Sequence, residues 1–160
     1  MVDKEAFRKA WSNFATGVTV ITTIQPDGHV HGITANGVCS VSLEPPLVLA
    51  CLGHNRNSYS LIKKRRRFAI NILDESQQRI AEYYTRDSKD RFGDVEVAFR
   101  FTSQGSAIVE GGLAYMDCQV VAEHKAGDHT IFVAKVDEIG LKQGRPLLFF
   151  ESGFHRLSSP

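Results

Sequence analysis

The stretch VTVITTIQPDGHVHGITA, residues 18–35, is the part of the sequence that decides the fold class. Residues 18–24 are β-branched, and this composition is typical of a buried strand. Residues 26–28 read Pro-Asp-Gly, which is a turn signal, and residues 29–35 can then return as a second strand. Two neighbouring strands joined by a tight turn form a hairpin, so this stretch begins an antiparallel sheet.

The same alternation of short apolar runs and turns continues along the chain. We expect further strands at residues 38–43, 47–52, 68–73, 113–124, 129–141 and 146–150. Helices are expected at residues 3–16, 55–64 and 76–84. Residues 86–112 are polar and contain glycines, so they form the longest loop, with short strands in it. The expected strands are mostly consecutive in the chain, and this pattern favours an antiparallel barrel with added helices over a parallel βαβ sheet.

The first predicted helix has an apolar face. Asp3 can cap its start, and Gly17 ends it. Four apolar side chains recur at helical spacing between these two positions: Phe7, Ala10, Trp11 and Phe14. A barrel of this size also leaves strand edges and an apolar patch exposed, so we expect a two-fold homodimer.

Length, composition and charge limit the classes of protein that fit. The chain has 160 residues, of which 42% are apolar, and this suits one folded domain over residues 1–160. The formal net charge of +1 gives no reason to expect a nucleic acid or an acidic membrane as partner. No apolar run reaches the length of a membrane span. The basic run at residues 63–67 is best interpreted as a solvated helix end, and a phosphate-facing role is the alternative.

The cysteines indicate a reducing compartment. Cys39, Cys51 and Cys118 show no CxxC spacing and no paired histidine, so a zinc site is not expected. Their odd number, together with the lack of a signal peptide, predicts a cytoplasmic protein.

Small polar residues inside the predicted strands are the first candidates for a binding site. Residues 34–37 read Thr-Ala-Asn-Gly at the end of one strand, and residues 40–42 read Ser-Val-Ser in the next. Such residues leave backbone N–H and C=O groups accessible to a flat heteroaromatic ring. The alternative is a tight turn with Asn36 and Gly37 in the left-handed conformation.

Two further positions could act on a ligand. Asn57 and Ser58 lie where a helix starts, and a helix N-terminus beside a hydroxyl can bind phosphate, with Arg56 adding charge. A plain N-cap is the alternative. His129 opens a strand directly after Gly127 and Asp128, so it is either a catalytic residue or a structural turn residue.

Taken together, these segments resemble the flavin reductase-like family, the short reductase components of two-component flavin monooxygenases. The resemblance runs in the family's order over residues 7–157, nearly the whole chain. It is carried by residues 7–10, 14–20, 31–36, 40–47, 57–58, 91–92, 127–129 and 146–149.

The resemblance implies a fold, an assembly and a set of binding residues. The fold would be an FMN-binding split barrel of antiparallel Greek-key type, and the assembly a homodimer with the flavin near the interface. The wall beside the isoalloxazine ring would be formed by Thr34, Ala35, Asn36, Ser40, Val41, Ser42 and Cys51. At Gly37 this chain departs from the family, which often has serine there, and glycine still suits a tight backbone approach to the ring.

The remaining residues implied by the resemblance surround the phosphate and the hydride donor. Asn57 and Ser58 would hold the phosphate, and Phe92 would help to close the site. His129 would be the catalytic residue facing the nicotinamide, with Gly153 and Phe154 near the same pocket.

The implied activity is hydride transfer from NADH or NADPH to FMN, with FAD possible, to supply a separate monooxygenase. Flavin chemistry belongs to the ring, so no protein acid or base is strictly required. Two alternatives stay open. One is an FMN-binding protein that carries electrons or senses redox state without turning over NAD(P)H. The other is a related split-barrel oxidase of the pyridoxamine-phosphate oxidase type, which should show a basic cluster for a substrate phosphate.

Overall fold

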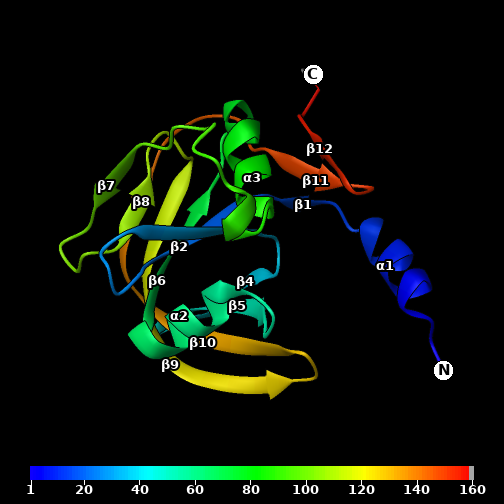
Figure 1. The fold of residues 1–160 in the computed structure, drawn as a ribbon, viewed down its shortest axis with the longest axis horizontal. Coiled ribbons are helices and arrows are strands. Elements are labelled where there is room, and N and C mark those ends of the chain that lie inside the picture. The colour runs from blue at the N-terminus through cyan, green and yellow to red at the C-terminus, as the bar shows by residue number, and fades with distance from the viewer. Residues whose placement is uncertain (159–160) are drawn as a thin grey trace.

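The computed structural model describes residues 1–158 and shows a mainly β protein built on one large antiparallel sheet (Figure 1). This sheet has seven strands in the order β3-β2-β6-β9-β10-β5-β4. Their bounds are β2 Thr19–Ile24, β3 Val30–Ala35, β4 Val38–Leu43, β5 Pro46–Gly53, β6 Arg67–Ile72, β9 Ala114–Ala126 and β10 His129–Leu141. The prediction of an antiparallel β fold is confirmed, and the two predicted hairpins are the pairs β2–β3 and β9–β10.

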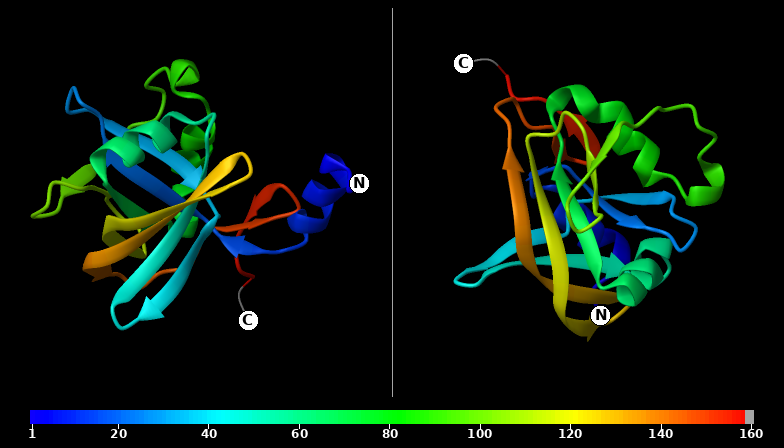
Figure 2. Two further views of the ribbon diagram at one scale, coloured as in Figure 1. Left: turned by 90° about the horizontal axis from the view of Figure 1, so that it is seen from below. Right: turned by 90° about the vertical axis from the view of Figure 1, so that its left-hand side faces the viewer.

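The strand order is a Greek key. Within the large sheet, β6, β9 and β10 follow one another both along the chain and in space. β5, which comes before them in the chain, pairs with β10, the last of the three. Four consecutive strands of the sheet therefore have the spatial order that defines the motif. The two views of Figure 2 show the strands twisting and curling around a common core.

Short strands complete the β structure, and they bring the number of strands in the described residues above the eight predicted ranges. A second sheet pairs β1 (Thr16–Gly17), β11 (Leu148–Phe150) and β12 (Gly153–His155). A third consists of β7 (Phe99–Phe101) and β8 (Ala107–Val109), inside the predicted long loop. Segments of two or three residues are too short to show a periodic pattern, so β1 and β12 could not be predicted from the sequence.

The described residues also form three α-helices and two short 3₁₀ helices. Their bounds are α1 Lys4–Ser12, α2 Asn57–Arg65, α3 Gln78–Thr85, η1 Glu75–Gln77 and η2 Ser88–Asp90. The predicted helix over residues 3–16 is too long, because Asn13 caps α1 and residues 16–17 pair with β11 instead. In the described part of the chain, no helix combines the length and apolar character needed to cross a membrane.

The basic run at residues 63–67 belongs to the end of α2 and the start of β6, as its structural interpretation predicted. Lys63, Lys64 and Arg65 occupy the last turn of α2, where cations are favourable. Arg66 forms an ion pair with Glu123 at 3.0 Å. Arg67 pairs with Asp117 and Asp137, each at 2.8 Å.

Helix α1 stands apart from the sheets (Figure 1). Asp3 caps it through a hydrogen bond accepted from the N–H of Ala6 at 3.1 Å. Its apolar side chains are nevertheless largely exposed, at 63% for Phe7 and 62% for Trp11, and Phe14 just after its end is 61% exposed. The apolar face that the sequence predicted is present, but this chain does not bury it.

The core has two parts that meet along β2. The main cluster fills the inside of the large sheet and includes Phe68, Phe132 and Ile62, the last from α2. A smaller cluster lies under α3 and joins Val20 to Leu147, with Phe149 and Phe154 of the second sheet packed against it. β3, at the edge of the large sheet, therefore has α2 on one side and α3 on the other, and the candidate site lies along this strand.

Candidate functional site

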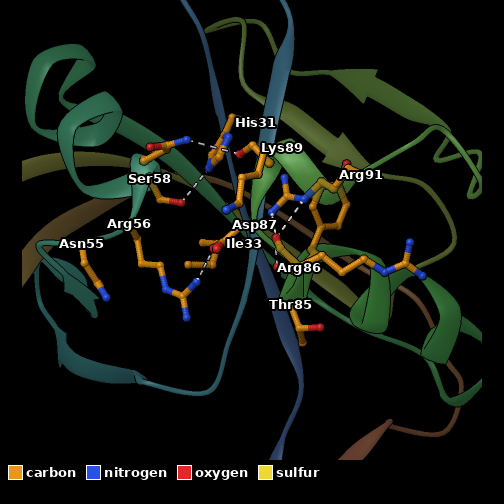
Figure 3. Close-up of a pocket in the computed structure, with 13 residues that line it drawn as sticks. His31, Ile33, Asn55, Arg56, Ser58, Thr85, Arg86, Asp87, Lys89 and Arg91 are labelled. Carbon is orange, nitrogen blue, oxygen red and sulfur yellow. Dashed lines mark hydrogen bonds and ion pairs between the residues drawn. The ribbon is translucent and has the colours of Figure 1, made fainter.

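A cavity of about 270 Å³ lies at the N-terminal end of α2 (Figure 3). We call it the helix-end cavity. Its walls are His31 and Ile33 of β3, residues 55–58, residues 84–89 and Arg91. Arg56, which precedes α2, makes no side-chain hydrogen bond to the first turn of the helix. The first-turn N–H groups of a helix lack intrahelical acceptors, so this wall of the cavity is suited to an anion.

Ser58 lies in the wall of this cavity and is hydrogen-bonded to His31, a residue that the sequence analysis did not propose for the site. Ser58 is 1% exposed and His31 is 5% exposed. The Nε2 atom of His31 lies 2.8 Å from the Oγ atom of Ser58 (Figure 3). Burial, together with the charge of Arg91, lowers the pKa of His31 to about 4. At neutral pH His31 is therefore an uncharged hydrogen-bonding group.

Arg91 is a half-buried cation whose hydrogen-bond acceptors are backbone carbonyls. Its Nε and Nη2 atoms donate to the carbonyl of Arg86 at 3.1 and 2.8 Å, and its guanidinium lies 4.9 Å from the ring centroid of Tyr84. Burial lowers the pKa of Arg91. The buried carboxylate of Asp117 differs from Arg91 in having a direct ion-pair partner, Arg67. It also accepts hydrogen bonds from the hydroxyls of Thr102 and Ser106. The charge of Asp87 acts on Arg91, but the ion pair of Asp87 at 2.8 Å is with Arg56, and no carboxylate accepts a hydrogen bond from Arg91 in the described residues. A half-buried cation with no direct carboxylate partner is costly, so Arg91 points to an anionic ligand.

The other charged side chains that line the helix-end cavity are cations, apart from the carboxylate of Asp87. Arg56 forms an ion pair with Asp87 at 2.8 Å across the cavity, both side chains being exposed. Lys89 also lines the cavity. Arg86 is neutralised by Asp94 at 2.8 Å. Arg91, Lys89 and the start of α2 therefore give this cavity a positive character.

A second cavity, of about 130 Å³, lies at the far end of β3, and we call it the strand-end cavity. It is lined by Val18, Thr34, Ala35, Asn36, Thr85, Phe149 and Phe154. The backbone here is held by side chains, since the hydroxyl of Thr34 donates to the carbonyl of Ala81 and that of Thr19 to the carbonyl of Ala35, each at 2.6 Å. Thr85 lines both cavities, so the two lie next to each other along β3.

The alternative of a left-handed turn at Asn36 and Gly37 is wrong, because neither residue has a positive φ. Instead the carbonyl of Gly37 accepts a hydrogen bond from the N–H of Cys51 at 2.8 Å. A Cβ atom at position 37 would lie 3.3 Å from the Cβ of Cys51. This close approach explains why glycine suits the position. Cys51 is half-buried beside it, and burial raises the pKa of its thiol.

The remaining predicted ring contacts lie on β4, an edge strand. Ser40 and Val41 are exposed and Ser42 is half-buried. The pairing of β4 with β5 shifts register between Ser40 and Ser42, which is a β-bulge. These residues line neither the helix-end nor the strand-end cavity.

The structure separates the other predicted residues. Asn57 lies in the helix-end cavity, where its amide donates to the hydroxyl of Ser88 at 3.4 Å. Phe154 lines the strand-end cavity, and its neighbour Gly153 pairs with Phe150 outside both cavities. Phe92 is 83% exposed and also lines neither cavity. The predicted closing position of Phe92 therefore has no support in this chain alone.

His129 begins β10 at the turn of the β9–β10 hairpin. Its Nδ1 atom donates to the carboxylate of Asp128 at 2.7 Å. This hydrogen bond lowers the pKa of Asp128 and keeps its carboxylate charged. A Cβ atom at Gly53 would lie 3.4 Å from Nε2 of His129 and 3.0 Å from Oδ1 of Asn55. His129 is thus next to the segment that forms one wall of the helix-end cavity.

Comparison with known proteins identifies the family. A model described as "Flavin reductase like domain" matches residues 11–158. A Rhodococcus opacus protein named as the reductase component of 4-nitrophenol 4-monooxygenase/4-nitrocatechol 2-monooxygenase is 39% identical over 153 residues, covering 96% of this chain and 80% of that protein. An Agrobacterium fabrum protein named FMN reductase (NADH) is 35% identical, covering 98% of this chain and 87% of that protein.

A solved structure agrees. The flavin reductase PheA2 in its native state has a TM-score of 0.91 and 39% sequence identity, covering 99% of this chain and 100% of that one. The chain therefore belongs to the flavin reductase-like family, and the resemblance found in the sequence is confirmed.

Sequence reasoning missed the residues that converge on the helix-end cavity from distant segments. His31 is one of several isolated histidines, and its spacing to other residues gave no signal. Arg91 entered only through the resemblance. A weak signal was available in residues 86–91, where three cations fall among polar residues: Arg86, Lys89 and Arg91.

Proposed function

We propose that this protein is an oxidoreductase that transfers a hydride from NADH or NADPH to a flavin. The observation that carries the proposal is the arrangement of two neighbouring cavities along β3, one lined by cations and one walled by small and aromatic residues, with Thr85 in the wall of both. A flavin mononucleotide has the same two parts, a phosphate and a flat ring. Relatives named as flavin reductases support this interpretation.

The phosphate of FMN would bind in the helix-end cavity. Asn57, Ser58 and the first turn of α2 supply hydrogen-bond donors, and Arg91 supplies a positive charge that donates only to backbone carbonyls within the described chain. FAD, which has a second phosphate, would reach toward Lys89 and Arg56 at the open side of the same cavity.

The ring would lie beside Thr34, Ala35 and Asn36, with Phe154 at one end. The hydrogen bonds from Thr19 and Thr34 hold this backbone in place, so it presents the ring with a fixed edge. Ser40, Val41, Ser42 and Cys51 would extend the wall around Gly37. The bound flavin supplies the redox chemistry, and these residues orient it.

His129 would contact the nicotinamide. Because Nδ1 donates to Asp128, the neutral ring offers Nε2 as an acceptor. An acceptor at this point suits the amide N–H group of a nicotinamide carboxamide. We propose that His129 orients the donor ring so that its hydride faces the flavin.

We further propose that the protein is a homodimer of single-domain subunits, each a split barrel spanning residues 1–160. The exposed aromatic face of α1, with Phe7, Trp11 and Phe14, is the surface that a second copy would cover. An ordered helix without a buried residue gains little stability from its own chain, so a partner surface accounts for it.

The reduced flavin would pass to a separate monooxygenase, as the names of two-component relatives suggest. A cytoplasmic location is part of the proposal, and the free thiols Cys39, Cys51 and Cys118 support it. The basic cluster of the helix-end cavity would also suit a phosphorylated substrate of a split-barrel oxidase. The flavin reductase relatives favour the reductase over that oxidase and over a non-catalytic FMN carrier.

One experiment tests the proposed function. The purified protein is mixed with NADH or with NADPH, with and without FMN, and oxidation of the donor is followed by the loss of the reduced nicotinamide absorbance. We expect flavin-dependent oxidation of at least one donor. Binding of FMN without oxidation of either donor would favour the non-catalytic carrier.

A further inference from the structure

His31 and Ser58 form a buried pair that the proposed mechanism does not use. His31 comes from β3 and Ser58 from the first turn of α2, and their side chains meet at 2.8 Å although the residues are 27 positions apart. Both are almost fully buried, at 5% and 1% exposure, and both line the helix-end cavity. The pair therefore links the edge strand to the helix end at the place proposed for the phosphate.

The direction of this hydrogen bond decides what Ser58 can offer a ligand. A serine hydroxyl has a single proton, and a phosphate dianion only accepts hydrogen bonds. If Ser58 donates to His31, its proton is turned away from the phosphate. If His31 donates from Nε2, the hydroxyl proton of Ser58 is free to point into the cavity.

The surroundings of His31 keep its ring neutral, so the tautomer matters. Arg91 is the cation that acts on it, and Lys89 is another cation in the lining of the same cavity. Tyr84 is packed against the neighbouring Gly32, and burial raises the pKa of this tyrosine to about 12, so it stays uncharged. A neutral imidazole has one donor and one acceptor nitrogen, and the bound partner selects between them.

We propose that His31 is a positioning residue, which donates from Nε2 to the Ser58 hydroxyl and thereby directs the Ser58 proton to the phosphate of the flavin. This inference rests on the proposed phosphate site in the helix-end cavity. It adds a residue from β3 to a site whose other donors come from α2 and residues 84–91. His31 acts through Ser58, so its effect depends on the ligand having a phosphate.

Variants at both positions test the pair. Dissociation constants for FMN and for riboflavin, which lacks the phosphate, are measured by flavin fluorescence. We expect Ser58→Ala and His31→Leu each to weaken FMN by about tenfold, the scale of a hydrogen bond to a charged group, and to leave riboflavin unchanged. The double variant should be no weaker than Ser58→Ala alone, because the two residues act as one unit. His31→Gln, whose amide N–H can replace the donor, should recover most of the affinity.

His29→Leu is the matched control, since this exposed histidine lies on the turn before the same strand and should leave FMN binding unchanged. Equal losses for FMN and riboflavin in His31→Leu, or losses that multiply in the double variant, would overturn the proposal. If Ser58→Ala has no effect on FMN, the phosphate site itself is wrong. If only His31→Leu has no effect, the site stands and the role of His31 falls.

A measurement on the unchanged protein covers the case in which His31→Leu does not fold. The ring ¹⁵N shifts of His31 in the FMN complex at neutral pH report the position of its proton. We expect a neutral ring with the proton on Nε2. A neutral ring with the proton on Nδ1 would mean that Ser58 donates to His31, and it would refute the proposal.

Discussion

The guanidinium of Arg91 lies 4.9 Å from the centre of the Tyr84 ring, and this contact holds the cation in the wall of the helix-end cavity. Arg91→Gln removes the charge while keeping a hydrogen-bonding side chain. We expect FMN to bind at least about tenfold more weakly, because a charged hydrogen bond to the phosphate is lost. Fluorescence titration with FMN and with riboflavin measures this, and a riboflavin affinity that falls equally would show that Arg91 only supports the fold.

His129 separates the catalytic proposal from simple flavin binding. His129→Ala should leave the affinity for FMN almost unchanged, because the residue lies outside both cavities. Flavin reduction by NAD(P)H should slow by about tenfold, equivalent to about 1.4 kcal/mol of lost transition-state stabilisation. Anaerobic stopped-flow bleaching of flavin absorbance measures the rate. His124→Ala, an exposed histidine on the same hairpin, is the control, and bleaching of the His129 variant at the parent rate would exclude the role.

The exposed face of α1 predicts self-association. In sedimentation velocity at micromolar concentration, the parent protein should be a dimer. Replacing Trp11 and Phe7 by serine should shift it toward a monomer without lowering the stability of the subunit fold, because both side chains are more than half exposed in the single chain. A parent protein that sediments as a monomer would contradict the proposed assembly.

The buried carboxylate of Asp117 should be important for stability. It is 0% exposed, pairs with Arg67 and accepts from two hydroxyls. Asp117→Ala should lower the free energy of unfolding by about 3 kcal/mol, because it leaves a partly buried arginine short of a partner. Glu123→Ala, which breaks the exposed pair with Arg66, should cost less than about 1 kcal/mol. Urea denaturation of both variants checks the difference, and equal costs would count against it.

The buried His31 predicts a dependence of stability on pH. Its pKa falls from 6.5 to about 4 on folding, so the unfolded chain binds more protons between these values. Stability from this group is therefore fully present above pH 6.5 and is lost as the pH falls toward 4, by up to about 3 kcal/mol. Comparing the parent with His31→Gln by urea denaturation at both ends of this range isolates the contribution. An identical pH dependence in the two proteins would show that other groups account for it.

Local pattern determined the strands and hairpins of this protein. The β-branched run at residues 18–24 and the Pro-Asp-Gly turn after it specify a hairpin through their own backbone preferences, and β2 and β3 form there. The Asn57–Ser58 helix start is equally local, and α2 begins at Asn57. The resemblance to a known family depended on the order in which these segments follow one another, because no single segment is specific to that family.

Tertiary structure decided where helix α1 ends and which residues meet at the site. Residues 16–17 leave the helical pattern because β11, more than a hundred positions later, offers them a strand partner. His31, Ser58 and Arg91 come from three segments, and nothing in their spacing brings them together. Their meeting depends on how α2 and residues 84–91 pack on either side of β3. Backbone propensities act over a few residues, so the sequence alone determined the elements, while side-chain packing across the sheet determined the site.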